Sequence, residues 1–199
     1  AVAKFGIIGL GNPGSNYIRT RHNTGFWFLD EFAKQNNTSF TQDKKFRADI
    51  CKLDYANTHK ILLIKPTTFM NNSGSRLPSL LKHSGFFGSN IVVVHDELTL
   101  PLGSLKISTT KGAGGHNGVK SIMAAMTTPF IRVRIGIGSK SLPDQSLADY
   151  VLSKFTQVEA DSLRIRLPYF VNALHSIIDS GVEKTMSLFN QEKQIETTP

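Results

Sequence analysis

The chain is organised around residues 9–23, Gly-Leu-Gly-Asn-Pro-Gly-Ser-Asn-Tyr-Ile-Arg-Thr-Arg-His-Asn, which directly follow the apolar run Phe5-Gly-Ile-Ile8. Glycine and proline fix special backbone turns, and asparagine offers both a hydrogen-bond donor and an acceptor. Histidine has an ordinary pKa of about 6.5, so it can take up a proton near neutral pH. A segment of this composition cannot fill a core. It predicts an active-site loop that leaves the carboxyl end of a buried strand.

The same loop also has the spacing Gly-x-Gly-x-x-Gly, at residues 9–14, which is found in dinucleotide-binding loops. That motif opens a helix at once and needs an acidic residue about 20 positions later, at the end of the next strand. Here Pro13 interrupts the turn, and the polar residues 15–23 lack helical periodicity. Asp30 lies at about the right distance, but inside a segment, 25–34, with helical spacing. A nucleotide-dependent enzyme therefore stays an alternative.

Length and composition predict a globular protein with a single core. The 199 residues, 40% of them hydrophobic and 19% charged, suit one catalytic domain over residues 1–190 and a flexible tail over 191–199. No apolar run approaches the roughly 20 residues that cross a bilayer, and a signal-peptide pattern is lacking, so we expect a cytoplasmic protein with no membrane contact. The single cysteine, Cys51, excludes an internal disulfide and a cysteine-rich metal site.

The net charge of +8 is unevenly distributed along the chain. Residues 1–140 contain 18 lysines and arginines against 7 acidic residues, whereas residues 141–199 contain 5 against 8. The positive charge therefore accompanies the part that carries the polar motifs. Such an imbalance attracts polyanions, of which nucleic acid is the commonest in a cytoplasm, although a basic excess can also serve solubility alone.

Apolar runs and turn signals predict strands interleaved with helices. The predicted strands span about residues 3–9, 46–55, 61–65, 91–94, 105–108 and 132–137, with a hairpin turn at 56–60. The predicted helices span about residues 23–35, 73–84, 119–126, 157–180 and 182–189, with Ser73 as a cap, a kink or break at Pro168, and a flexible linker at 139–145. This order predicts an α/β domain, with a mixed twisted sheet sandwiched between helices in three layers.

Four polar loops are expected to meet at one edge of that sheet. Residues 12–23, 67–71 and 95–96 each follow a strand, and residues 114–118 open a helix. Ligands of α/β sheets bind outside the carboxyl ends of parallel strands. With the adjacent Glu97, the loops supply three histidines, two carboxylates and several asparagines, but no thiol. This inventory suits attack by water: histidine takes the proton, a carboxylate orients the imidazole, and amides donate to the oxyanion.

The motifs in these loops resemble those of bacterial-type peptidyl-tRNA hydrolase. They are Gly-Asn-Pro-Gly-x-x-Tyr-x-x-Thr-Arg-His-Asn at 11–23, Pro-Thr-Thr-Phe-Met-Asn-x-Ser-Gly at 66–74, His-Asp-Glu-Leu at 95–98 and Gly-Gly-His-Asn-Gly at 114–118. The resemblance covers about residues 3–190, with all four motifs in order. It implies a monomeric, metal-independent esterase without a cofactor or an obligate protein partner. Its reaction would separate the peptide from the terminal adenosine ribose of peptidyl-tRNA and so recycle the tRNA.

The resemblance also assigns roles to individual side chains. It implies that His22 is the general base and that Asp96 holds it in its basic form. Asn12 would sense the peptide group of the substrate and help to reject unblocked aminoacyl-tRNA. The other implied substrate-binding residues are Tyr17, Phe69, Met70, Asn71 and Asn117.

A basic clamp on the acceptor stem and 5′ phosphate of the tRNA is a further implication of the resemblance. Arg134 matches one member of the clamp, but the other, usually a lysine, falls on Ser108. Lys106, two residues earlier on the same strand face, or the nearby Lys111 could replace it. Arg132 shares the strand face of Arg134, and without the resemblance that face would be a solvated surface.

Two questions stay open at the level of sequence. His95 and His116 have structural interpretations, packing for the first and ordering of the glycine loop for the second, and a zinc site made by all three histidines is the less favoured alternative. The chain could also be a non-catalytic RNA-binding relative of the hydrolases, similar to a splicing factor. Turnover of a blocked aminoacyl-tRNA separates that alternative from an esterase.

Overall fold

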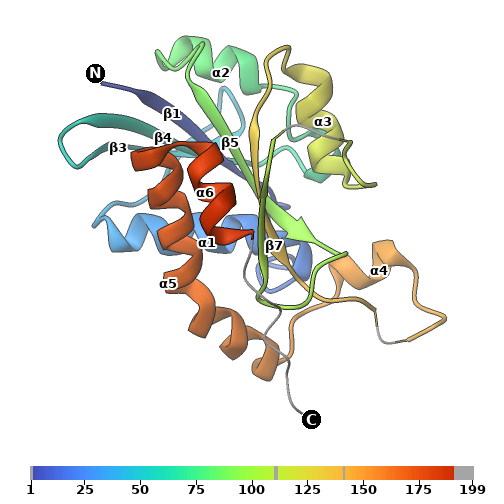
Figure 1. Cartoon of the computed structure of the whole chain (residues 1–199). Coiled ribbons are helices and arrows are strands. Elements are labelled where there is room, and N and C mark those ends of the chain that lie inside the picture. Colours follow the sequence, from blue (N-terminus) through green and yellow to red (C-terminus); the bar gives the residue numbers. More distant parts are fainter. Residues whose placement is uncertain (1, 110–111, 141, 191–199) are drawn as a thin grey trace.

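The computed structural model describes residues 2–109, 112–140 and 142–190 (Figure 1). Seven strands in this part of the chain form one mixed sheet in the order β2-β3-β4-β1-β5-β7-β6. They are β1 (Lys4–Gly9), β2 (Thr41–Asp43), β3 (Ala48–Tyr55), β4 (His59–Pro66), β5 (Asn90–Glu97), β6 (Leu105–Ser108) and β7 (Ile131–Gly136). The four central strands β4, β1, β5 and β7 are mutually parallel, and the strands at both edges are antiparallel to their neighbours.

Helices cover both faces of the sheet (Figure 1). They are α1 (Thr24–Gln35), α2 (Leu77–His83), α3 (Asn117–Ala125), α4 (Leu147–Leu152), α5 (Gln157–Ser180) and α6 (Val182–Phe189), with the short 3-10 turns η1 (Arg21–Asn23) and η2 (Met70–Asn72). Side chains of α1 and α5 form one core with the sheet, and those of α2 and α3 form the other. The predicted three-layer α/β fold is confirmed.

The central strands are almost continuously apolar because helices cover both faces of the sheet, as strand β5 shows. Val92 and Val94 belong to the core under α1 and α5, whereas Ile91 and Val93 belong to the core under α2 and α3. Successive side chains of a strand point to opposite faces, so a strand covered on both faces needs apolar residues at every position. The polar residues His95 to Glu97 follow this apolar run, at the carboxyl end of β5, where the strand can present polar side chains.

Two details of the sequence prediction are wrong, the break at Pro168 and the cap at Ser73, whereas a kink at Pro168 stays a prediction. Helix α5 is a single helix that continues through Pro168. Pro168 is exposed, and the buried stripe of α5 packs against the core on both sides of it. Ser73 does not cap α2, which begins four residues later; its hydroxyl donates to the carbonyl oxygen of Met70 and closes η2 instead.

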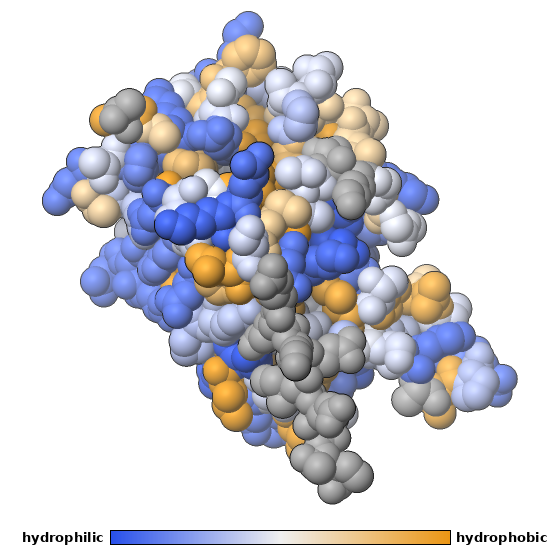
Figure 2. Space-filling model, viewed as in Figure 1, coloured by the Kyte–Doolittle hydropathy of each residue, from blue (hydrophilic) through white to orange (hydrophobic). Residues whose placement is uncertain are grey.

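Strand β2 and helix α4 were not predicted. Helix α4 follows the predicted linker and lies on a segment that projects from the body of the molecule (Figures 1 and 2). It has six residues, too few for a clear helical period. Its N-cap is Ser146, whose hydroxyl accepts from the backbone N–H of Asp149. None of the helices described, α5 included, combines the length and apolarity that a membrane span requires. The predicted tail at 191–199 lies outside the described residues.

Candidate active site

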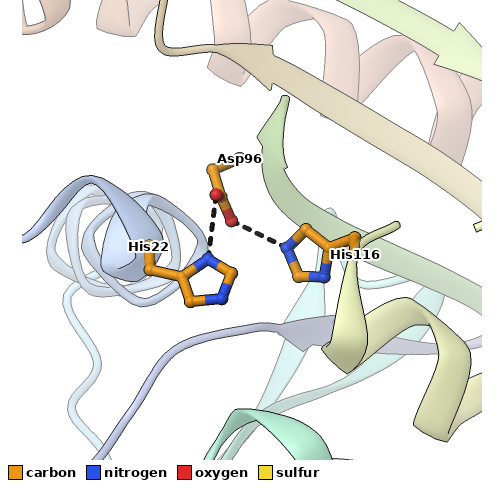
Figure 3. Close-up of side chains that lie close together, drawn as sticks. All are labelled: His22, Asp96 and His116. Atoms are coloured by element: carbon orange, nitrogen blue, oxygen red, sulfur yellow. Dashed lines mark hydrogen bonds and ion pairs between the residues drawn. The ribbon is translucent and has the colours of Figure 1, made fainter. Parts of the chain in front are cut away.

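Three of the predicted loops bring their side chains together around Asp96, at the carboxyl end of β5 (Figure 3). His22, in η1, places Nδ1 2.9 Å from Oδ2 of Asp96. His116, the N-cap of α3, places Nε2 2.8 Å from the other oxygen, Oδ1. The carboxylate is almost fully buried, whereas the side chains of His22 and His116 keep 12% and 9% of their surface exposed. One carboxylate therefore holds two imidazoles from distant parts of the chain.

These hydrogen bonds fix the tautomer of each neutral imidazole. An ionised carboxylate only accepts, so Nδ1 of His22 and Nε2 of His116 must each carry the proton that is donated to Asp96. The other nitrogen of His116 accepts from the backbone N–H of Val119, at 3.3 Å. Nε2 of His22 makes no hydrogen bond within the described residues. It is the nitrogen with a lone pair available to take a proton from water.

Asp96 is ionised in this setting. Burial favours the neutral form, but the two imidazoles, through their charge and their hydrogen bonds, overcome that effect and hold the pKa of Asp96 well below its usual range. A carboxylate that stays charged can orient His22 and can stabilise an imidazolium when His22 takes up a proton.

His95 and Arg132 support Asp96 from behind. His95 is buried, and its Nδ1–H donates to the backbone carbonyl oxygen of Asp96 at 2.7 Å, while its Nε2 accepts from Nε of Arg132 at 3.1 Å. Burial, followed by the charges of His116 and Arg132, lowers the pKa of His95 and keeps it neutral. Arg132 also donates to the carbonyl oxygen of Gly112, in the loop that leads to His116. Arg132 is therefore a buried structural residue, and the solvated-surface interpretation is wrong for it.

Arg21 anchors the turn that carries His22, a role the sequence did not suggest. Its guanidinium forms a two-point ion pair with Glu159 at 2.7 and 3.0 Å, and its Nε donates to Ser153 at 3.0 Å. It also lies over the rings of Tyr150 and Phe155, at 4.6 and 5.1 Å from their centroids. The turn next to the candidate base is thus fixed to the segment that includes α4 and the start of α5.

A network of amides joins the first two motifs. The backbone N–H of Asn12 donates to Oδ1 of Asn23 at 2.8 Å, and Nδ2 of Asn23 donates back to the carbonyl oxygen of Asn12 at 2.9 Å. Oδ1 of Asn12 accepts from the backbone N–H of Met70 at 2.8 Å. This bond fixes the orientation of the Asn12 amide, whose Nδ2 makes no hydrogen bond within the described residues. Asn12 is therefore preset as a donor.

The remaining predicted substrate-binding residues lie on the same loops but differ in burial. The ring of Tyr17 packs edge-on against Phe69 with centroids 6.3 Å apart, and Phe69 is 47% exposed with a positive φ of 65°. Such a backbone is unfavourable for phenylalanine, which indicates that its surroundings hold the ring outward. Met70 is buried in the core under α2 and α3. Asn71 and Asn117 have exposed side chains.

Two of the predicted phosphate-binding residues are cross-strand neighbours. Lys106 on β6 stands opposite Arg134 on β7, and Lys106 is exposed. Nε of Arg134 pairs with Glu97 at 2.7 Å, and its two terminal nitrogens make no hydrogen bond within the described residues. Ser108, at the usual lysine position, is buried opposite Arg132, and its hydroxyl has no hydrogen-bond partner among the residues that the structure describes. Lys111 lies outside the described residues.

The Asp96 cluster is also the one grouping, within the described part of the chain, whose composition could hold a metal ion. The ligand atoms of His22, Asp96 and His116 all lie within 4.8 Å of one another. However, the nitrogens that face the carboxylate are already hydrogen bonded to it, so a metal would have to displace two protons and both bonds. The arrangement as it stands is that of an orienting carboxylate between two imidazoles.

The sequence model of the peptidyl-tRNA hydrolase family matches residues 6–197. The chain belongs to this family. The crystal structure of peptidyl-tRNA hydrolase from Acinetobacter baumannii superposes with a TM-score of 0.85 at 31% identity, covering 96% of each chain. A peptidyl-tRNA hydrolase crystallised with N-propanol gives the same TM-score at 30% identity, covering 97% of this chain and 96% of the other. The predicted family is confirmed.

The nucleotide-binding alternative is not supported by the geometry of the first loop. Residues after Gly14 form turns, an isolated bridge between Thr20 and Lys154, and then η1, and α1 begins only at Thr24. The helix N-terminus that should follow the glycines directly and hold a pyrophosphate is therefore absent from this loop.

Proposed function

We propose that the chain hydrolyses the ester between the peptide, or an N-blocked aminoacyl group, and the terminal adenosine ribose of peptidyl-tRNA. The observation that carries this proposal is the Asp96 carboxylate holding His22 by Nδ1, so that Nε2 is available to deprotonate water. Family membership supports the same reaction. A translating cytoplasm is the compartment that supplies this substrate.

In this mechanism His22 takes a proton from water as the oxygen attacks the ester carbonyl. The tetrahedral oxyanion receives hydrogen bonds from amide groups, for which Asn12, Asn71 and Asn117 are the candidates. His22 then returns the proton to the ribose oxygen, which leaves with the tRNA. Asp96 stays ionised throughout and stabilises the transient imidazolium.

The basic edge formed by Lys106 and Arg134 is proposed to bind phosphates of the acceptor stem. Arginine offers several donors in one plane, which matches phosphate geometry, and Arg134 has two terminal nitrogens without a partner in the described part of the chain. The neighbouring Lys106 adds a second charge. With Ser108 uncharged, Lys106 takes over the role of the usual lysine.

The test is release of N-acetyl-phenylalanine from N-acetyl-phenylalanyl-tRNA by the purified chain. We expect multiple turnover, equal rates with and without a chelator, and much slower release from unblocked phenylalanyl-tRNA. Binding of the tRNA without ester cleavage over hours would support the alternative, an RNA-binding relative of the hydrolases. A rate that disappears with chelation and returns with a metal would overturn the metal-independent mechanism.

A further inference from the structure

A cavity lies beside the turn that carries His22. None of the residues that line it belongs to the Asp96 cluster of His22, Asp96 and His116. Its volume is about 340 Å³, within the range of small-molecule sites. It is formed by the end of the first loop, α1 and the beginning of α5. The lining residues are Ile18, Arg19, Thr20, Asn23, Thr24, Trp27, Phe155, Thr156, Gln157, Ala160, Leu163 and Arg164.

Most polar side chains of this cavity are occupied by the protein itself. The hydroxyls of Thr20 and Thr24 donate to backbone carbonyl oxygens, Thr156 accepts from the amide of Glu159, and both ends of the Asn23 amide bind Asn12. The Gln157 amide donates to Asp161. These groups shape the cavity but have little left to offer to a ligand.

The lining groups that can still donate a hydrogen bond to a ligand are two guanidinium groups and one indole N–H. Arg19 and Arg164 form no ion pair or hydrogen bond within the described residues, and the indole N–H of Trp27 has no acceptor there either. No carboxylate lines the cavity. Two guanidinium groups and an indole N–H therefore favour an anion, and phosphate suits the planar, multiple donors of arginine.

The apolar part of the cavity adds a preference for a ring. Trp27, Phe155 and Leu163 line it together with the two arginines, and one face of the Phe155 ring is already covered by Arg21. Aromatic walls bind flat ligands, nucleobases among them, by stacking. We propose that the cavity binds a nucleoside monophosphate, with the base against Trp27 and Phe155 and the phosphate on Arg19 and Arg164. This site is separate from the ester-cleaving centre and does not depend on the proposed function.

Trp27 is the only tryptophan of the chain and lines both this cavity and the neighbouring one that contains Asn12. Its fluorescence therefore detects a ligand in either cavity, and an Arg164 variant decides between them. The experiment is a titration of the intact protein with AMP, with adenosine and with inorganic phosphate, excited where the nucleotide does not absorb. We expect a saturable change with AMP and at least tenfold weaker responses to adenosine and to phosphate. No saturable change with AMP at millimolar concentration would overturn the proposal.

Variants locate the binding to this cavity. Arg164 is exposed on α5, so Arg164→Gln should fold normally and weaken AMP binding by about tenfold, the cost of one charge-assisted contact. Lys184→Gln removes the same charge from exposed α6, away from the cavity, and should bind AMP as the native chain does. Equal AMP affinity in native chain and Arg164→Gln would place the nucleotide elsewhere and refute the assignment.

Discussion

The Asp96 cluster and the Lys106–Arg134 edge use charge in different ways. In the cluster, a carboxylate that is almost fully buried is hydrogen bonded to two imidazoles. At the edge, an exposed lysine stands beside an arginine that is only partly engaged by Glu97. Charges inside a protein are little screened, whereas exposed ones are screened by salt. Under the proposed function, the buried centre suits proton transfer and the exposed edge suits attraction of a polyanion.

Replacing His22 by glutamine should have the largest effect of any single change in the cluster. Glutamine keeps a polar side chain but cannot take the proton of water, so kcat should fall by roughly 10²- to 10⁴-fold while tRNA affinity changes little. Single-turnover hydrolysis and a tRNA binding assay measure the two quantities. A near-native rate would remove His22 as the base.

The second largest loss is expected for Asp96→Asn. An amide presents one acceptor instead of two, so one imidazole must turn or change its tautomer, and the transient imidazolium loses its counter-charge. The rate should fall by roughly 10²- to 10³-fold with unchanged salt dependence of tRNA binding. If the salt dependence changed as well, the separation between centre and edge would fail.

His116→Asn tests whether the two imidazoles of the cluster are equivalent. His116 donates to Asp96 but has its other nitrogen occupied by the backbone of Val119, so it positions the carboxylate and cannot itself accept a proton from water. The rate should fall by about tenfold, the cost of one hydrogen bond to a charged group. A loss as large as that of His22→Gln would show that His116 has a direct part in the chemistry.

At the Lys106–Arg134 edge, Arg134→Gln should weaken tRNA binding by about three- to tenfold. The slope of the logarithm of the binding constant against the logarithm of the salt concentration should fall in magnitude by nearly one. The rate at saturating substrate should be native. Lys34 is exposed on α1, and Lys34→Gln is the matched control. It removes one charge at a position distant in sequence from Lys106 and Arg134. Identical salt slopes for the two variants would argue against a phosphate contact at Arg134.

Acid stability offers the finest comparison, because each region contains one carboxylate with a lowered pKa. A carboxyl group of this kind stabilises the fold above its unfolded pKa, about 4, and the contribution is lost as the pH falls towards the folded pKa. For Glu97, burial opposes the shift and the hydrogen bond from Arg134 produces it. Denaturant titrations at pH 2–6 measure how the free energy of unfolding falls with acid. This fall should be shallower in Asp96→Asn than in Glu97→Gln, since Glu97 is more exposed than Asp96.

Much of the fold follows from local patterns. The apolar runs in β1, β4 and β5 identify buried parallel strands, and the helical stripe of α5 persists over 24 residues. Helix α4 could not be found in this way, because six residues give too little periodicity. The expected break at Pro168 failed because packing of the stripe outweighs one lost backbone hydrogen bond when the proline faces water.

The candidate site was predictable in its residues but not in its connections. His22, Asp96 and His116 belong to motifs that any reading of the chain would single out, but the sequence could not show that His116 shares the carboxylate with His22. Arg21 stands in the first motif without a role assigned to it, and Arg132 was marked only by its charge and its strand face. Their roles depend on Glu159 and His95, partners 138 and 37 positions away along the chain.

The sequence by itself determined the strands, the polar loops at their ends and the chemical groups available there, because hydrophobic periodicity and turn residues act over short distances. Only the tertiary structure decided which groups meet. The parallel order β4-β1-β5 places the loops from three parts of the chain at one edge of the sheet, and His116 reaches them from the N-terminus of α3. Hydrogen bonds and ion pairs depend on atoms a few ångströms apart, and only the folded chain sets those distances.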